Sequence, residues 1–275
     1  QAVGLATVRV LYGEVNPSGH LPETFPVKLS DNPSYLFYGG EGNEADYREG
    51  VFVGYRYYDT YNKAVDSPFG FGLSYATFEV SDVKAVKTGA CTATVTAVVK
   101  NTSNVDAAET VQVYVAPGKA DVARPKHELK GFKKVFLKAG ESAEVSFELD
   151  DRAFAYWSEK FNDWHVESGE YAIEVGTSSR DIAGSAVVEL DGDGKAQPLT
   201  EWSNFSEWRK DPLGSKVLEI LRAEGEAGRM PVVPDNDMTR LFLDSMPINS
   251  MSVLMGADGK QIFEYMLEKY AELTK

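Results

Sequence analysis

The chain has 275 residues, 43% hydrophobic and 12% aromatic, and its 28 basic and 42 acidic side chains give a formal net charge of −14. This composition excludes a disordered chain and fits one large or two ordinary domains. The acidic balance argues against nucleic acid or anionic lipid as a partner. No uncharged apolar run reaches about 18 residues, so we expect no membrane span. The single cysteine, Cys91, excludes an intrachain disulfide and a thiolate zinc cluster.

Residues 1–34 begin with an apolar helix pattern and continue into an extended segment. The apolar side chains between Ala2 and Leu11 follow directly on Gln1, with no initiator Met and no signal segment. Two prolines within residues 21–26 forbid a helix there. Because a stable domain rarely begins inside a helix, we expect the chain to be a piece of a longer polypeptide.

Residues 35–78 hold 13 aromatic side chains, interleaved with glycines. The glycines allow tight turns, so this segment is predicted to be irregular. The aromatic side chains allow two interpretations, a platform that stacks on sugar rings or a domain junction filled with large side chains. The pattern around Gly54 favours the junction.

Four carboxylates lie within this aromatic segment, at Asp46, Glu49, Asp59 and Asp66. A pair of carboxylates among aromatic rings is the arrangement that glycoside hydrolysis needs. Spacing alone does not bring two of them together. The simpler interpretation is that Glu49 and Asp59 accept hydrogen bonds from arginines 48 and 56 or from tyrosine hydroxyls in a packed interface.

Residues 79–190 alternate apolar and polar side chains, with turn signals at intervals typical of a β-sandwich. Val95, Ala97 and Val99 share one face of a predicted strand, and similar patterns recur at residues 111–115, 145–149 and 171–175. About seven short strands in this length predict an immunoglobulin- or fibronectin-type sandwich.

Residues 191–275 return to helical patterning. Ser215 is predicted to cap one helix, and a final helix is predicted to start at Asp258 with Gln261 as its capping-box partner. The apolar side chains of this last helix fall on one face between Ile262 and Leu273, which has to be buried on the same body or on a neighbouring one.

A search for catalytic and metal-binding motifs finds little. His20, His127 and His165 are isolated, which favours surface or capping roles over metal ligation. No nucleophile elbow, phosphate-binding loop or dinucleotide fingerprint is present. We therefore expect no metal site and no cofactor.

Three segments carry a resemblance to a known family. Residues 16–26 (NPSGHLPETFP), 47–59 (YREGVFVGYRYYD) and 68–78 (PFGFGLSYATF) resemble consecutive motifs of family 3 glycoside hydrolases of the β-glucosidase type, and residues 128–135 and 178–182 resemble their fibronectin-like module. The resemblance covers roughly residues 1–190. It departs at His20, where the family usually has Lys, and at Phe71, where it usually has His.

The resemblance implies an α+β multi-domain fragment. Residues 1–75 would be the C-terminal part of an α/β sandwich domain with an aromatic linker, residues 76–190 an all-β fibronectin type III-like sandwich, and residues 191–275 a mostly helical extension. The family uses a retaining mechanism with an Asp nucleophile and a Glu acid/base, both expected upstream of Gln1. No catalytic residue is carried over, and this chain alone is expected to be inactive.

The implied partners are the N-terminal barrel and α/β portion of the same enzyme, possibly as a separate chain, and a β-glucoside or cello-oligosaccharide. Residues that border the substrate cleft are expected at Tyr38, Tyr47, Tyr55, Arg56 and Tyr58. The helical tail is expected to form a homodimer or, alternatively, to wrap its own subunit. The compartment stays open between bacterial cytoplasm and secretion.

A different class of function is a free-standing carbohydrate-binding or structural module without catalysis. Trp157 and Trp164 would support it if one flat face presented both rings. They fall in a predicted hairpin, however, that the hydrolase family shares.

Overall fold

The computed structural model describes all residues except 1, 41, 196–197, 234–236 and 275. The chain forms two compact units, residues 1–195 and residues 196–275, here called the sandwich unit and the tail unit. Each is described by itself. Among the described residues, no helix combines the length and apolar character that a membrane crossing requires.

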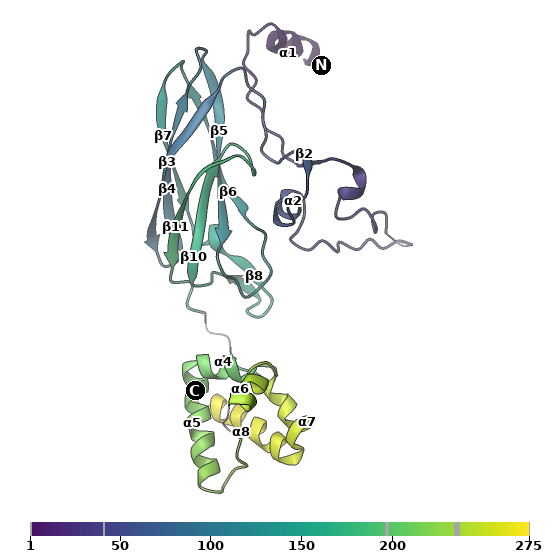
Figure 1. The fold of residues 1–275 in the computed structure, drawn as a ribbon, viewed down its shortest axis with the longest axis vertical. Coiled ribbons are helices and arrows are strands. Elements are labelled where there is room, and N and C mark those ends of the chain that lie inside the picture. Colours follow the sequence, from purple (N-terminus) through teal and green to yellow (C-terminus); the bar gives the residue numbers. More distant parts are fainter. Residues whose placement is uncertain (1, 41, 196–197, 234–236, 275) are drawn as a thin grey trace. The chain divides into compact units, whose positions relative to one another are not determined.

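The N-terminal segment of the sandwich unit contains only short elements, most of them outside the sandwich (Figure 1). They are α1 (Val3–Leu11), β1 (Phe25–Pro26), the 3-10 turn η1 (Leu29–Asp31), α2 (Tyr55–Thr60) and β2 (Val65–Ser67). β1 pairs with β2 in an antiparallel ribbon. The predicted irregular character of residues 35–78 is therefore largely confirmed, with α2 as the exception.

Two antiparallel sheets form the body of this unit, in a fibronectin type III-like arrangement (Figure 1). One sheet has the strand order β11-β10-β5-β6 and the other β3-β4-β7. The strands are β3 (Phe78–Gly89), β4 (Thr92–Asn101), β5 (Ala107–Pro117), β6 (Glu128–Leu137), β7 (Ser142–Leu149), β10 (Gly169–Gly176) and β11 (Ile182–Leu190). Between β7 and β10 the chain adds α3 (Asp151–Phe154) and a hairpin of β8 (Tyr156–Ser158) and β9 (Asp163–His165).

The core of the sandwich follows from the alternation in the sequence. Val95, Ala97 and Val99 on β4 expose 1% or less of their surface, as do residues 111, 113 and 115 on β5. Their intervening neighbours face outward or toward the N-terminal segment. Because a strand turns successive side chains to opposite faces, this period-2 pattern predicts both the strands and their buried face. The sandwich prediction is confirmed.

The tail unit is a small helical body with a core of its own. Its helices are α4 (Phe205–Lys210), α5 (Pro212–Glu226), α6 (Asp237–Leu243), the 3-10 turn η2 (Ile248–Ser250), α7 (Met251–Met255) and α8 (Ala257–Leu273). Trp208 is fully buried and meets the Tyr270 ring edge-to-face at 5.4 Å. Ile262 and Met266 of α8 are also fully buried in this core. The amphipathic face of the last helix is therefore covered within the tail unit itself.

Two predicted helix starts in the tail are wrong. α5 begins at Pro212, and the Asp211 carboxylate caps it by accepting hydrogen bonds from the backbone N–H groups of Leu213 and Gly214. Asp followed by Pro is a stronger start signal than the Ser215 hydroxyl, which lies inside the helix. α8 begins at Ala257 after Gly256 and has no side-chain cap, so the predicted capping box at Asp258 does not form.

Candidate functional site: a buried polar junction

The short helix α2 connects the N-terminal segment to the sandwich. It starts after Gly54, whose φ of +54° is a backbone conformation that side chains other than glycine rarely adopt. Tyr58 and Asp59 are its buried members, and Asp59 exposes only 7% of its surface. A carboxylate is rarely buried unless it is paired, so the partners of Asp59 define this junction.

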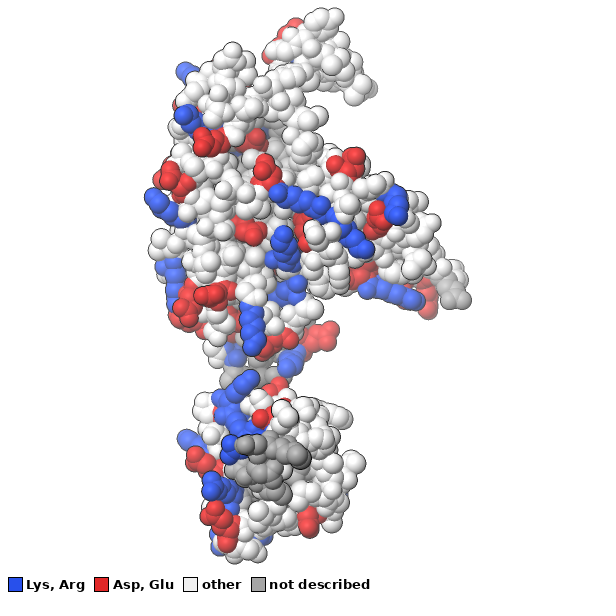
Figure 2. Space-filling view, in the orientation of Figure 1, with Lys and Arg blue, Asp and Glu red and all other residues white. Residues whose placement is uncertain are grey.

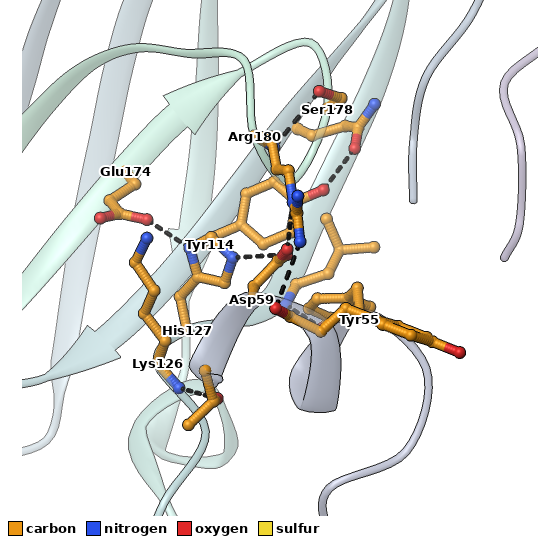
Figure 3. A network of polar contacts seen from close by, with 12 residues as sticks. Tyr55, Asp59, Tyr114, Lys126, His127, Glu174, Ser178 and Arg180 are labelled. Atoms are coloured by element: carbon orange, nitrogen blue, oxygen red, sulfur yellow. Dashed lines mark hydrogen bonds and ion pairs between the residues drawn. The ribbon is translucent and has the colours of Figure 1, made fainter. Parts of the chain in front are cut away.

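Asp59 accepts hydrogen bonds from two side chains of the sandwich (Figure 3). The Nε of Arg180, in the loop between β10 and β11, donates to Oδ1 at 2.6 Å. The same guanidinium donates through Nη2 to the backbone carbonyls of Tyr58 and Lys63, at 3.2 and 2.8 Å. One arginine therefore fixes both the carboxylate and the backbone at the end of α2.

His127 stands immediately before β6 and lies between two carboxylates (Figure 3). Its Nδ1 is 2.5 Å from Oε2 of Glu174 on β10, and its Nε2 is 3.4 Å from Oδ2 of Asp59. The side chain is 1% exposed. The expectation of a surface or capping role is thus wrong for His127, because its partners lie 68 and 47 residues away in sequence and leave no local signal.

Aromatic rings pack around the Asp59–His127 pair. The Tyr55 ring of α2 stacks on Phe69 at 4.5 Å, and the Tyr114 ring of β5 stacks on His127 at 4.8 Å. The Tyr55 hydroxyl accepts a hydrogen bond from the Leu129 backbone N–H at 2.7 Å. The rings exclude water from the junction, which strengthens the charge-assisted hydrogen bonds inside it.

A second contact joins the N-terminal segment to β5. Gln112 donates through Nε2 to the carbonyls of Gly70 and Thr177, at 3.0 and 2.6 Å, and its Oε1 accepts a hydrogen bond from the Tyr114 hydroxyl at 2.6 Å. Gly70 has a φ of +80°, and a Cβ there would lie 2.1 Å from Oε1 of Gln112. Only glycine fits this approach of the backbone to the amide.

His20 extends this second contact. Its Nδ1 lies 2.5 Å from the Gly70 carbonyl and its Nε2 lies 3.0 Å from Oε1 of Glu109 on β5. Lys134 on β6 donates to the Ser18 carbonyl at 3.0 Å beside it. The motifs at residues 16–26 and 68–78 are therefore both attached to the same face of the sandwich.

These contacts shift the pKa values of the buried groups. Desolvation raises the pKa of Asp59, but hydrogen bonds from His127 and Arg180 outweigh it, so the net shift is downward. Desolvation lowers the pKa of His127, and its hydrogen bonds to Asp59 and Glu174 reverse that effect and raise it. The hydrogen bond to Glu109 raises the pKa of His20. These contacts therefore favour the charged carboxylate of Asp59 and the charged imidazoles of His20 and His127.

The structure separates the five predicted cleft residues into two groups. Tyr55, Arg56 and Tyr58 lie on α2 at the junction, where Arg56 pairs with Glu128 at 3.2 Å. Tyr38 and Tyr47 are 88% and 91% exposed on the loops before α2. The expected partners of Asp59 are wrong, because Arg48 pairs with Asp46 at 2.7 Å and Asp59 pairs with the sandwich.

The geometry of the junction suits attachment. Both ring nitrogens of His127 and both carboxylate oxygens of Asp59 are occupied by side chains of the chain itself. Both groups are also buried, Asp59 at 7% and His127 at 1% exposure, so a substrate has little access to either. In the described part of the chain, no group of three His, Cys, Asp or Glu side chains could hold a metal ion.

Two family models match this chain. Residues 1–55 match the glycosyl hydrolase family 3 C-terminal domain, and residues 109–179 match the fibronectin type III-like domain. The chain is thus the C-terminal portion of a glycosyl hydrolase family 3 protein: the end of the α/β domain, a fibronectin type III-like sandwich and a helical extension.

The relatives agree on this class. An exo-α-(1→6)-L-arabinopyranosidase of Bifidobacterium breve is 65% identical over 100% of this chain, which covers 36% of that protein. The thermostable β-glucosidase B of Acetivibrio thermocellus is 44% identical over 99% of this chain, again 36% of the relative. The crystal structure of a Bifidobacterium adolescentis GH3 β-glucosidase matches 79% of this chain and 32% of that one, with a TM-score of 0.76 and 71% identity. The chain therefore spans about a third of the length of these relatives.

Proposed function

We propose that this chain acts as the C-terminal part of an exo-acting glycoside hydrolase, whose N-terminal portion supplies the nucleophile and the acid/base. In this proposal residues 1–75 complete the α/β domain, and the sandwich supports it through the polar junction. The chain contributes attachment and cleft-bordering side chains, with Tyr38 and Tyr47 as the candidates for the cleft border because they are the exposed members of the five.

The observation that carries the proposal is the apolar surface of residues 3–53. No residue of α1 is buried, although the helix contains Val3 and Leu5, which are 78% and 68% exposed. Leu36 is 92% exposed on the loop before α2. In Figure 2 most of the surface of α1 carries neither acidic nor basic side chains. Exposed apolar surface of this extent marks a protein interface, and the proposed occupant is the N-terminal portion of the enzyme.

The names of the relatives support a proposal for the substrate class. The relatives include proteins named for β-glucosidase and for α-L-arabinopyranosidase activity. Both sugars carry the scissile bond equatorially on a pyranose ring. They differ in the exocyclic hydroxymethyl group, which the arabinoside lacks, and in the configuration of one ring hydroxyl. We propose a terminal β-D-glucosyl residue as the preferred substrate. The alternative is a terminal α-L-arabinopyranosyl residue, and an assay has to compare the two.

Complementation tests this proposal. This chain is mixed with the N-terminal portion of the 65% identical Bifidobacterium breve relative and assayed on the aryl β-D-glucoside and the aryl α-L-arabinopyranoside. The relative's own C-terminal portion serves as the positive control. We expect activity in both mixtures and none in this chain alone. Activity of the chain alone, or a working control beside an inactive mixture, would contradict the proposal.

The exposed tryptophans bear on the alternative of a carbohydrate-binding module. Trp157 is 50% exposed, but its ring meets Trp164 at 79°, and the Arg152 guanidinium lies 3.4 Å from the centroid of the Trp164 ring. The two rings therefore do not form the flat face that this alternative requires. The test is retention of the chain on insoluble glucan. Retention that Trp157→Ala abolishes would support the carbohydrate-binding alternative.

The homodimer stays a proposal that rests on the tail unit. Its core is internal, so any dimer contact has to use side chains outside that core, such as Leu241 and Val253, which are 79% and 85% exposed. The double change Leu241→Ser and Val253→Ser leaves the core intact. If the tail forms the dimer, light scattering gives a lower mass for this variant than for the wild type. An unchanged mass would contradict the tail dimer.

A further inference from the structure

Two of the three histidines in this chain share a geometry that requires a proton. The two ring nitrogens of His127 face carboxylate oxygens of Glu174 and Asp59, at 2.5 and 3.4 Å. The two ring nitrogens of His20 face the Gly70 carbonyl and a carboxylate oxygen of Glu109, at 2.5 and 3.0 Å. A neutral imidazole donates through only one nitrogen. With acceptors on both sides, each ring satisfies its partners only as the imidazolium.

We infer that His20 and His127 form a proton-dependent clamp that attaches residues 1–75 to the fibronectin-like sandwich. Each histidine joins the two bodies: His127 connects α2 with β10, and His20 connects the segment after α1 with β5. Loss of either proton places a nitrogen lone pair against an acceptor oxygen. The clamp joins two parts of this chain and does not depend on the proposed glycosidase activity.

His20 makes one of the two contacts titratable. A lysine ammonium keeps its charge to about pH 10, whereas the charge of histidine changes near neutrality. A lysine at residue 20 would therefore hold its charge opposite Glu109 over the pH range in which His20 loses it, and His127 is the second titratable contact.

Charges on all neighbouring elements bear on these two rings. His127 faces Asp59 on α2, with Arg180 behind that carboxylate, and Glu174 on β10, while the neutral rings of Tyr55 and Tyr114 lie against it. The residue directly before His127 in the chain, Lys126, is exposed.

His20 faces Glu109 on β5, which favours the charged ring, and the ammonium of Lys134 on β6, which disfavours it. The balance favours the charged imidazole at both positions, since the pKa of each is raised.

The direction of the pH dependence follows from these signs. A histidine with a raised pKa in the folded state stabilises fully below about pH 6.5, its ordinary value, and loses that effect as the pH rises through the folded-state value. Asp59, whose pKa is lowered, stabilises above its ordinary value of about 3.9 and loses the effect as the pH falls further. Attachment is therefore strongest in mildly acidic solution and weakens as the pH rises above about 6.5, the ordinary pKa of histidine.

The first experiment titrates the imidazole C–H resonances of the whole chain, which has only three histidines. Assignment uses the single variants His20→Gln, His127→Gln and His165→Gln. We expect the resonances of His20 and His127 to titrate above pH 6.5, the ordinary value for histidine. Midpoints at or below that value for both would overturn the clamp, and the midpoints themselves are read from the wild-type chain.

The second experiment measures hydrogen exchange against pH at α2 and at residues 18–22 and 70–72. In the wild type, the opening equilibrium is expected to rise by up to about tenfold per pH unit per histidine between the ordinary and the raised pKa. His20→Lys keeps a charge opposite Glu109 and should remove one of the two contributions at residues 18–22 and 70–72. His165→Gln is the matched control, because His165 pairs with Asp193 of the sandwich and not with residues 1–75. A pH dependence that His20→Lys leaves unchanged would overturn the role of His20.

Discussion

Residues 54–72 and residues 3–53 belong to the same N-terminal segment, but they meet their surroundings in opposite ways. The first stretch buries a carboxylate, Asp59, and pairs it with an arginine and a histidine of the sandwich. The second exposes large apolar side chains, Leu36 and Tyr47 among them, at 92% and 91%. The partners of Asp59 lie within this chain, whereas the described residues leave most of the surface of Leu36 and Tyr47 uncovered, although His20 of the same stretch contacts Gly70 and Glu109.

The difference shows how the two kinds of interface are built. A buried ion pair is sensitive to geometry, since removing one member leaves an uncompensated charge. An exposed apolar surface does not by itself unfold the chain, but it lowers solubility and favours association. The junction therefore fixes the orientation of α2 on the sandwich, whereas the apolar surface is the part that binds the N-terminal portion in the function proposed above.

The largest expected effect comes from removing the buried carboxylate. Asp59→Ala leaves the Arg180 guanidinium and the His127 ring without their shared acceptor. We expect the free energy for local opening of α2 to fall by about 3 kcal/mol, the usual cost of breaking a buried pair. Native-state hydrogen exchange at the backbone N–H of Lys63, which donates to the Tyr58 carbonyl at 2.8 Å, measures it.

The matched control is Asp46→Ala in the apolar stretch. Asp46 pairs with Arg48 at a similar distance, but both side chains are 64% exposed. Exposed ion pairs contribute little to stability, so we expect Asp46→Ala to change the free energy for local opening of α2 by less than about 0.5 kcal/mol. Equal effects of the two substitutions would mean that burial does not distinguish the two stretches.

A smaller effect is expected from Tyr114→Phe. The Tyr114 hydroxyl donates to Oε1 of Gln112, and the Gln112 amide in turn holds the Gly70 carbonyl. Loss of this hydroxyl leaves a buried acceptor unpaired, which costs about 1 to 2 kcal/mol of the unfolding free energy of the sandwich unit. Chemical denaturation followed by circular dichroism measures that free energy.

The control for this change is Tyr171→Phe. Its hydroxyl also donates inside the sandwich, to the Glu167 carbonyl at 3.0 Å, but it does not reach Gly70. Faster hydrogen exchange at Gly70 in Tyr114→Phe and not in Tyr171→Phe is the expected contrast. If both variants change exchange at Gly70 equally, the hydroxyl acts through general stability and not through Gln112.

The sequence predicts the sandwich well and the junction poorly, for one physical reason. The strand at residues 92–101 is predicted by the alternation of apolar and polar side chains, a pattern that depends only on neighbours two positions apart. The buried state of Asp59 depends on Arg180, which is 121 residues away. The junction interpretation of the aromatic segment predicted a packed interface, but it named arginines 48 and 56 or tyrosine hydroxyls as the partners of Asp59, whereas the partners are Arg180 and His127.

The short helix α2 and the helix starts in the tail are two further features that local sequence patterns do not predict. Tyr55–Thr60 is rich in aromatic residues and has no favourable helix propensity, so tertiary contacts of its buried side decide its conformation. In the tail, the apolar periodicity predicts α5 and α8. Their starts differ from the predicted ones because the Asp211 carboxylate caps α5 before Ser215, and α8 begins directly after Gly256, before Asp258. Boundaries follow from capping details that periodicity does not contain.

The smallest expected effect on stability comes from Leu36→Ser in the apolar stretch. Since Leu36 is 92% exposed, the substitution removes almost no buried surface, and the unfolding free energy of this chain should stay within about 0.5 kcal/mol of the wild type. Self-association measured by sedimentation should nevertheless decrease, because one large apolar side chain leaves the surface. In the complementation mixture the same variant should bind the N-terminal portion more weakly. A variant that loses stability but not association would mean that Leu36 packs within this chain, and the contrast between the two stretches would then be wrong.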